Sequence, residues 1–72
     1  MNFAIKIFVN GKNYKLKIKK YITIHQLVIF LYKKNKGIVL EYNKKIITPN
    51  LWKDIYIKPE DKIEILTIVG GG

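Results

Sequence analysis

The sequence predicts an α+β fold in which one helix lies across a mixed five-stranded sheet, with the elements in the order ββαβββ. Three observations support this prediction. Two alternating apolar and polar segments flank Asn10-Gly11, as in a β-hairpin. After Thr23 the apolar period changes to that of an amphipathic helix. Short strand patterns then follow as far as residue 69, so a sheet and a single helix form the two layers.

The first hairpin is predicted from the period of its two strands. Residues 3–9 alternate between two faces, and so do residues 14–18, where lysines separate the apolar positions. Asn10-Gly11 suits a type I′ turn, because that turn needs a positive φ at both central residues. Lysines on the second strand protect an exposed sheet edge against unwanted pairing.

The helix is predicted over about residues 24–35. Its apolar stripe has the spacing i, i+3, i+4 and i+7 from Ile24, and Thr23 with Gln26 fits a capping box. Lysines 33, 34 and 36 complement the dipole at its far end. Gly37 supplies a left-handed residue that ends it.

The second half of the chain reads as three further strands. Residues 38–42 and 45–48 form a short pair, a loop with a turn of helix covers 51–57, and the last strand spans 62–69. When the first and last strands lie parallel at the centre, the layout is that of a β-grasp fold. We expect one β-grasp domain over residues 1–69, followed by a flexible tail over residues 70–72. The predicted interior comprises Phe3, Ile5, Ile7, Leu16, Ile18, Ile24, Leu27, Val28, Leu31, Val39, Ile63 and Ile65.

Composition argues against catalysis by this chain alone. Its 72 residues include no cysteine, no serine and one histidine. Thiol chemistry, disulfides and thiolate metal sites are therefore excluded, and a histidine–carboxylate zinc site usually needs more than one histidine. We expect a protein that is not an enzyme and that binds no cofactor or metal of its own.

The net charge of +9 raises the question of a polyanionic partner. A basic domain is typical of nucleic-acid binding. However, isoleucine, lysine and asparagine supply 34 of the 72 residues while arginine is absent, which indicates a bias toward A/T-rich codons. No apolar run approaches the roughly 20 residues of a membrane span, and residues 1–9 lack the continuous apolar stretch of a signal peptide. We expect no nucleic-acid partner and no membrane association.

The chain ends in Gly70-Gly71-Gly72, which is its most informative feature. Glycine has no Cβ, so Gly70 and Gly71 allow the tail to enter a narrow cleft in an extended conformation. The α-carboxylate of Gly72 sits on an unbranched carbon and is accessible to an enzyme that adenylates it. We expect a flexible substrate arm held by a folded domain.

An apolar surface beside that tail is predicted from the strand alternation. Phe8, Leu66 and Ile68 point away from the helix, and their strands are expected neighbours. Contiguous exposed apolar surface commonly marks a docking site. We therefore expect these three residues to form a docking patch for a partner.

The sequence resembles the ThiS family of small sulfur carrier proteins over nearly its whole length. The resemblance rests on the opening strand to Asn10-Gly11, residues 23–31, Val39–Asn43, Trp52, and residues 61–65 leading to Gly70-Gly71-Gly72. The sequence departs from the family at Asn43-Lys44, where ThiS proteins often have Asn-Gly.

The resemblance implies a function in thiamine biosynthesis. In this family a ThiF-like, E1-like enzyme uses ATP and Mg²⁺ to adenylate the terminal carboxylate, here Gly72. A sulfur donor, of the cysteine desulfurase or rhodanese type, then converts it to a thiocarboxylate. A ThiG-like thiazole synthase takes up that sulfur. Gly71 and Gly70 would be the arm that threads into these enzymes.

Two alternatives remain open from the sequence. The small subunit of molybdopterin synthase and ubiquitin-like protein modifiers have a similar ending, although the former tends to have a proline shortly before its Gly-Gly. A soluble protein of the bacterial cytoplasm, or of the plastid stroma if organelle-encoded, fits the absence of targeting signals and the codon bias.

Overall fold

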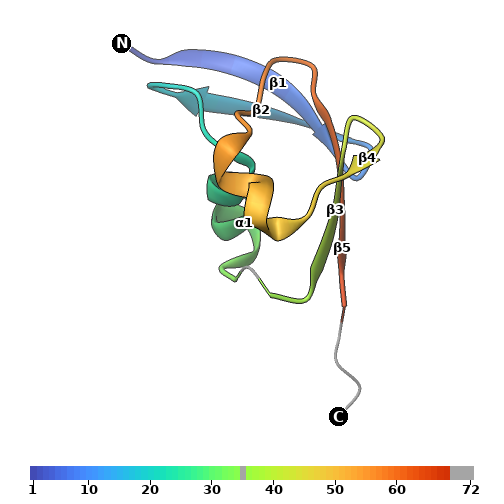
Figure 1. The fold of residues 1–72 in the computed structure, drawn as a ribbon. Helices are drawn as coiled ribbons and strands as arrows, with labels where there is room; N and C mark the ends of the chain where they lie inside the picture. Colours follow the sequence, from blue (N-terminus) through green and yellow to red (C-terminus); the bar gives the residue numbers. More distant parts are fainter. Residues whose placement is uncertain (35, 69–72) are drawn as a thin grey trace.

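A computed structural model describes residues 1–34 and 36–68, and it contains the predicted sheet and helix (Figure 1). The five strands lie in the order β2-β1-β5-β3-β4. Helix α1 covers one face of this sheet, and the predicted order of elements is confirmed. The elements are β1 (Phe3–Val9), β2 (Lys12–Ile18), α1 (Ile24–Tyr32), β3 (Ile38–Tyr42), β4 (Lys45–Ile46), the 3-10 helix η1 (Pro49–Asp54) and β5 (Lys62–Thr67).

The first hairpin and the central pair of strands are as predicted. Val9 faces Lys12 across a two-residue turn, in which Asn10 has a φ of 51° and Gly11 a φ of 81°. Both values are positive, as a type I′ turn requires. Strand β1 then pairs in parallel with β5, through Phe8–Lys62 and Val9–Ile63.

Helix α1 begins as predicted but ends earlier. The Thr23 hydroxyl accepts a hydrogen bond from the Gln26 amide, and the Gln26 side chain accepts one from the Thr23 amide, which completes the capping box. The predicted end near residue 35 is wrong, because Lys33 already adopts the left-handed conformation at a φ of 61°. Gly37 also has a positive φ, of 68°, but it lies in the connection to β3.

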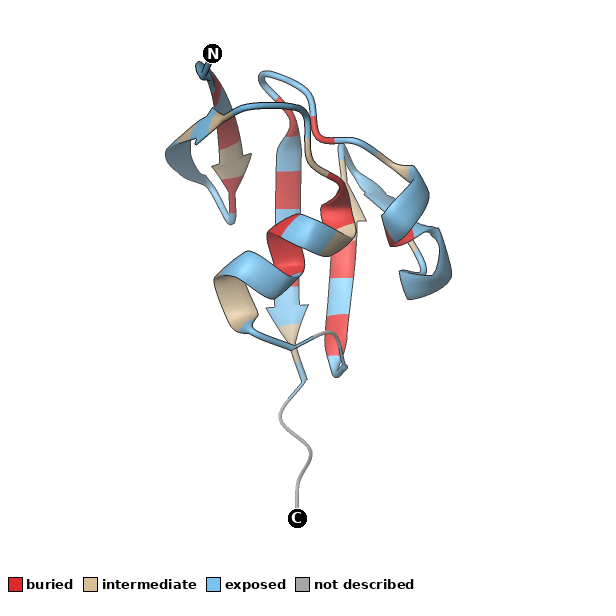
Figure 2. Cartoon of the chain, turned by 90° about the vertical axis from the view of Figure 1, so that its left-hand side faces the viewer, coloured by how far each residue is buried: buried red, intermediate tan, exposed pale blue. Residues whose placement is uncertain are grey.

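The hydrophobic core fills the space between α1 and the sheet, where the buried positions of both elements face each other (Figure 2). The prediction was wrong for Val39, which is 37% exposed, whereas its neighbours Ile38 and Leu40 are buried. Because all three residues are apolar, the sequence pattern does not show which of them face the core. The pairing of Leu40 with the buried Ile65 on β5 places Leu40 in the core. Phe3 is also exposed, and its ring packs edge-on against Tyr21. The buried apolar residues absent from the predicted interior are Val9, Ile38, Leu40, Trp52 and Ile57.

The segment between β4 and β5 closes the end of the core. Strand β4 has two residues, fewer than the four predicted, because Pro49 starts η1 soon after it. Trp52 is fully buried, and its indole N–H donates to the Ile47 carbonyl at 2.9 Å. Within the two described ranges, none of the helices has the length and apolar character needed to cross a bilayer.

Candidate functional site

The predicted reactive tail, Gly70 to Gly72, lies outside the described residues. The structure does describe the strand that leads to it. Strand β5 is central in the sheet, between β1 and β3. Contacts at the start, middle and end of β5 determine the course of the chain as far as Ile68. The candidate site consists of these contacts and of the surface beside them.

At the start of β5, Asp61 organises a polar cluster. Its side chain is almost fully buried and accepts hydrogen bonds from the Tyr42 hydroxyl, from the Asn43 side-chain amide at 3.2 Å and from the Lys58 amide at 2.7 Å. Asn43 also pairs with the backbone of Lys62, accepting from its N–H at 2.8 Å and donating to its carbonyl at 2.7 Å. These donors satisfy the hydrogen-bonding capacity of a buried carboxyl group, and the cluster ties β3 to β5.

The phenol of Tyr42 is held in its neutral form by this cluster. Burial raises the pKa of Tyr42 above its usual value, and both the hydrogen bond to Asp61 and the negative charge of Asp61 raise it further. Tyr42 therefore acts as a hydrogen-bond donor at neutral pH rather than as an acid.

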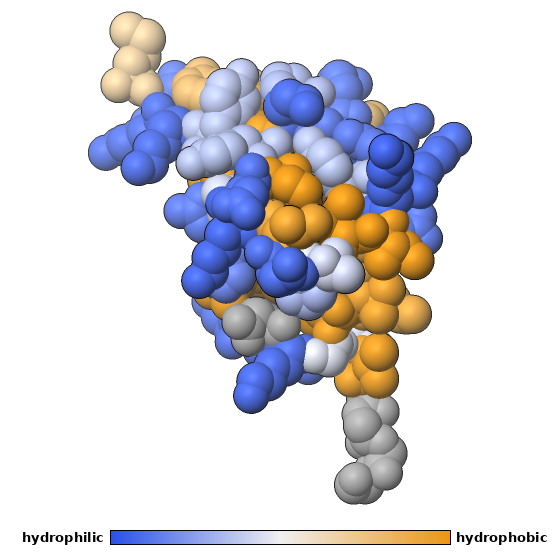
Figure 3. Space-filling model, viewed as in Figure 1, coloured by the Kyte–Doolittle hydropathy of each residue, from blue (hydrophilic) through white to orange (hydrophobic). Residues whose placement is uncertain are grey.

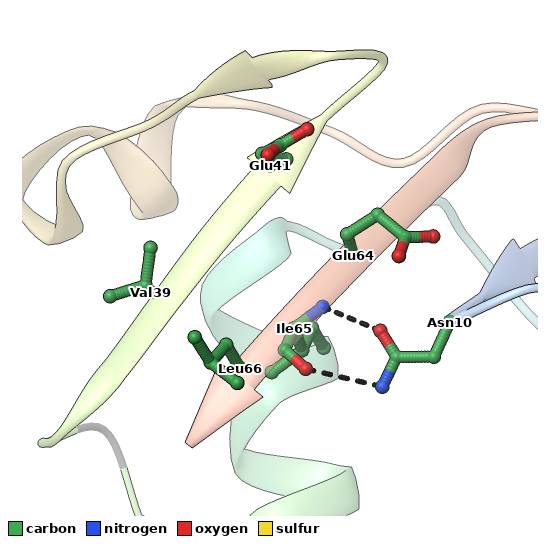
Figure 4. A pocket seen from close by; sticks show the side chains of 6 residues that line it. All are labelled: Asn10, Val39, Glu41, Glu64, Ile65 and Leu66. Carbon is green, nitrogen blue, oxygen red and sulfur yellow. Dashed lines mark hydrogen bonds between the residues drawn. The ribbon is translucent and has the colours of Figure 1, made fainter. Parts of the chain in front are cut away.

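In the middle of β5, the Asn10 side chain takes the place of a neighbouring strand. Because the chain turns after Val9, β1 offers no backbone partner to Ile65. The Asn10 Oδ1 accepts from the Ile65 N–H at 2.7 Å, and the Asn10 Nδ2 donates to the Ile65 carbonyl at 3.1 Å (Figure 4). This pair satisfies both backbone groups of a buried residue in the strand.

At the end of the described chain, Gly37 holds Ile68. The Ile68 N–H donates to the Gly37 carbonyl at 2.6 Å. A Cβ on Gly37 would lie 3.1 Å from the Ile68 carbonyl oxygen, and the φ of +68° also favours glycine. Gly37 therefore allows the last described residues to approach the connection between α1 and β3 closely.

The sheet face opposite α1 carries an apolar surface near this point, which we call the outer patch and define as Val39, Leu66 and Ile68. Val39 and Leu66 are cross-strand neighbours. They are 37% and 65% exposed, and Ile68 is 55% exposed. Figure 3 shows hydrophobic surface in orange along the β3 and β5 side, down to the grey C-terminal residues.

Phe8 lies apart from this patch. It pairs with Lys62, four residues before Leu66 on β5, so the two side chains are separated by about 13 Å along the strand. Phe8 is only partly exposed, with the Lys6 ammonium 5.7 Å from its ring centroid. The structure thus brings Leu66 and Ile68 together with Val39, and it does not bring Phe8 to them.

Two carboxylates border the outer patch. Glu41 and Glu64 are direct cross-strand partners on the same face as Val39 and Leu66. They lie two pairs further along the ladder, with the pair Leu40–Ile65 between them. Together with Asn10 and Ile65 these residues line a shallow depression of about 460 Å³ (Figure 4). Like charges directly opposite each other destabilise the pairing of two strands, so Glu41 and Glu64 weaken the pairing of β3 with β5 at this point. The result is an apolar surface with an acidic border.

Several residues at the site were missed by the sequence prediction. Asn10, Gly37 and Asp61 were assigned to turns or to the helix end, because their long-range partners are not visible in local patterns. Val39 was placed in the interior because residues 38–40 do not alternate. The one available signal was the charge of Glu41 and Glu64 within otherwise apolar strands.

Comparison with known proteins gives consistent matches over the whole length of the chain. A family model described as the ThiS family matches residues 5–72. The protein ycf40 of Trieres chinensis is 42% identical over 69 residues, which cover 96% of this chain and 92% of that protein. The sulfur carrier protein ThiS of Bacillus subtilis is 38% identical over 64 residues, covering 89% of this chain and 96% of that protein.

A solved structure gives the same picture of the fold. The crystal structure of the thiamine biosynthesis protein ThiS from Geobacter metallireducens superposes with a TM-score of 0.80 at 22% sequence identity. The match covers 94% of this chain and all of that one, 100%. It confirms the predicted β-grasp fold.

Proposed function

The chain belongs to the ThiS family, and we propose that it is a sulfur carrier of thiamine biosynthesis that holds sulfur on the carboxyl group of Gly72. The observation that carries this proposal is the match of the family model through Gly72, the last residue of the sequence. The absence of cysteine from the sequence is consistent with it, because a main-chain carboxyl group would hold the sulfur without any thiol.

The proposed chemistry has two steps, both performed by partner enzymes. First, a carboxylate oxygen of Gly72 attacks the α-phosphorus of ATP, with Mg²⁺ held by the partner, and pyrophosphate leaves. The carboxyl group becomes a mixed anhydride with AMP, which is a far better leaving group than an oxide. In the second step, the outer sulfur of a persulfide on the partner attacks the acyl carbon, and AMP leaves. A partner thiol then attacks the inner sulfur of that persulfide, which releases the thiocarboxylate on Gly72 and leaves a disulfide on the partner.

The folded domain's part in this reaction is to present the tail. The Asp61 cluster and Asn10 hold β5 at its start and middle, and Gly37 holds Ile68 just after its end, so that the described chain reaches residue 68 in one defined place. Gly70 and Gly71 can pass through a narrow channel because they lack side chains. A rigid base with a slender arm suits insertion into an enclosed adenylation site.

The outer patch is the proposed docking surface for the partners. These are a ThiF-like E1-like enzyme, a ThiG-like thiazole synthase, and a sulfur donor fed by a cysteine desulfurase or of rhodanese type. Its apolar centre fits an apolar partner surface, and Glu41 and Glu64 fit basic groups around it. Phe8 contributes separately, at the other end of the same face.

The proposed compartment is the plastid stroma. The relatives in Trieres chinensis and Porphyra purpurea are both called ycf40, a name of the kind given to organelle-encoded genes. The isoleucine, lysine and asparagine content also suits an A/T-rich organelle genome.

Deletion of Gly72 tests the function at its first step. With a ThiF-like enzyme, ATP and Mg²⁺, the intact chain should support exchange of labelled pyrophosphate into ATP, and the deletion variant should not. Gly71→Trp should fail in the same way because its side chain blocks the channel. A chain lacking Met1, which is fully exposed, is the matched control and should behave normally. Normal exchange by the Gly72 deletion variant would sink the proposal.

Leu66→Lys tests the docking surface. The substitution adds a charge at the centre of the outer patch, so affinity for the ThiF-like enzyme should fall by about tenfold or more in a calorimetric titration. Phe8→Lys should cause a smaller loss, since Phe8 lies outside the patch. Leu51→Lys, on η1, is the control for an added lysine at an exposed leucine and should bind normally. Equal affinities of Leu66→Lys and the unaltered chain would remove the docking role.

A further inference from the structure

We propose that the groove between β2 and α1 binds an extended acidic segment of a partner protein, which adds to the sheet as a strand beside β2. We call this hollow the β2–α1 groove and define it by Leu16, Ile18, Ile22, Leu27 and Phe30. The proposal does not depend on the sulfur-carrier function, because it concerns a different edge and the opposite face of the sheet.

The β2–α1 groove has a mainly apolar lining. Its volume is about 490 Å³. Leu27 is fully buried at its floor, and Leu16, Ile18 and Ile22 are half-buried along it. Phe30 stands at the rim with 68% of its surface exposed, although it lies on the helix beside the core. An aromatic side chain left on the rim of an apolar hollow is typical of a binding groove.

Strand β2 supplies the backbone part of the site. It is an outer strand of the sheet, paired with β1 on one side only. The alternate N–H and carbonyl groups on its free side are available to a further strand. A segment added there would direct every second side chain into the β2–α1 groove, because the side chains of a strand alternate between the two faces.

The charge around the groove selects an acidic occupant. Residues 10–40 contain eight lysines and no aspartate or glutamate, whereas all five acidic residues lie between positions 41 and 64. Lys15 and Lys17 flank Leu16 on β2, and their side chains lie on the face away from α1, because Lys15 pairs with the exposed Lys6 whereas Leu16 pairs with the buried Ile5. They therefore lie beside the alternate side chains that an added strand would turn to that face. Lysines on an edge strand oppose pairing with an uncharged or basic strand and attract an acidic one. Lys19 and Lys20 follow at the end of β2, and Lys33 follows at the end of α1. An extended segment with apolar residues flanked by carboxylates complements this layout.

A nucleic acid or a lipid surface fits the same charge less well. A bilayer would bind apolar side chains that project from a convex face, whereas here most of them line a hollow. A nucleic acid would be held by stacked aromatic residues on adjacent strands. In this groove Phe30 and Tyr14 stand on opposite walls, on a helix and on a strand.

The test uses the whole chain, isotopically labelled, and two synthetic peptides with the same apolar centre. The acidic probe is acetyl-Asp-Glu-Val-Ile-Val-Ile-Glu-Asp-amide, and the basic control replaces its four acidic residues by lysine. Amide resonances of β2 and α1 should shift with the acidic probe and not with the basic one. Two further probes are the acidic peptide N-methylated at both valines and the same peptide N-methylated at both isoleucines. One of the two should bind at least tenfold more weakly, because alternate amide protons of an added strand must donate to β2.

Substitutions locate the binding on the groove. Phe30→Ala should weaken the acidic probe about tenfold or more, as expected for an aromatic anchor. Ile46→Ala is the matched control, because Ile46 is also 68% exposed but lies on β4 at the other edge of the sheet. The affinity of this variant for the acidic probe should equal that of the unaltered chain. Replacing both Lys15 and Lys17 by glutamate should reverse the preference between the acidic and basic peptides.

Three results would overturn the proposal. One is the absence of shifts in β2 and α1 at acidic peptide concentrations up to about 1 mM, the weak end of specific affinities. Another is equal binding of the acidic probe and both N-methylated probes. The third is a response of the same resonances to an oligothymidylate or to phosphatidylserine vesicles when the acidic peptide gives none, which would assign the surface to one of those ligands.

Discussion

At the scale of single residues, β5 is held in place by side chains where neighbouring backbone is missing. Asn10 is the clearest case, since one amide group pairs with both backbone groups of Ile65. Its φ of 51° is also tolerated well by asparagine. One residue thus makes the first hairpin turn and supports the strand that leads to the tail.

Asn10→Gly should lower the free energy of unfolding by about 1–3 kcal/mol, because Ile65 loses its partners for two buried polar groups while the turn keeps its backbone conformation. Denaturant titration measures the loss, and faster hydrogen exchange at Ile65 locates it. Asn10→Asp keeps the acceptor for the Ile65 N–H, so its free energy of unfolding should lie between those of Asn10→Gly and the unaltered chain. A stability of Asn10→Gly equal to that of the unaltered chain would show that the amide contributes nothing.

Tyr42 gives the domain a dependence on alkaline pH. Burial and Asp61 raise its pKa in the folded state, so the neutral phenol stabilises the fold below the ordinary tyrosine pKa of about 10. Above that pH the unfolded chain releases the proton while the folded chain keeps it, and stability falls as pH rises. Tyr42→Phe should cost about 1 kcal/mol at pH 7 and should flatten this decline. An unchanged slope between pH 9 and about 11 would contradict the assignment.

At the scale of elements, the second hairpin contains a strained position. Lys44 has a φ of 73° in the turn between β3 and β4, next to Asn43 at 49°. A lysine is disfavoured in this region. Lys44 therefore suits the backbone conformation of this turn poorly.

Lys44→Gly should raise the free energy of unfolding by about 0.5–1 kcal/mol, since glycine removes the steric cost at a positive φ. Thermal denaturation followed by circular dichroism measures the change. The matched control is Lys45→Gly, one residue later in β4, which should be neutral or destabilising because a strand residue gains nothing from glycine. If both substitutions had the same effect, the backbone argument would be wrong.

The elements also show how far local pattern predicts structure. The turn of the first hairpin and the capping box were predicted to the residue, because Asn10-Gly11 and Thr23–Gln26 are short-range signals. Strand β2 begins at Lys12, two residues before its predicted start at residue 14. The side of β3 that faces the core was predicted wrongly. Ile38, Val39 and Leu40 are all apolar, and only the pairing with β5 places Leu40 in the core. The site followed the same rule: Leu66 and Ile68 were found from alternation, whereas Asp61 and Gly37 depend on partners distant in the sequence.

At the scale of the whole molecule, the +9 charge is unevenly distributed. The acidic residues occur from Glu41 onward, and two of them, Glu41 and Glu64, border the outer patch. The flank made by β2 and α1 is purely basic. The acidic border on β3 and β5 and the basic flank on β2 and α1 lie on different elements, so they can attract different partners at the same time. The excess of lysine thus has a proposed use in partner choice, apart from any bias in codons.

The most direct test of the central proposal is the intact mass of the chain after incubation with a ThiF-like enzyme, ATP, Mg²⁺ and a sulfur donor. We expect a gain equal to the exchange of one oxygen for one sulfur, located by fragmentation at Gly72 and absent from the Gly72 deletion variant. An unchanged mass under conditions that load the ThiS protein of Bacillus subtilis would contradict it, as would sulfur placed on any other residue.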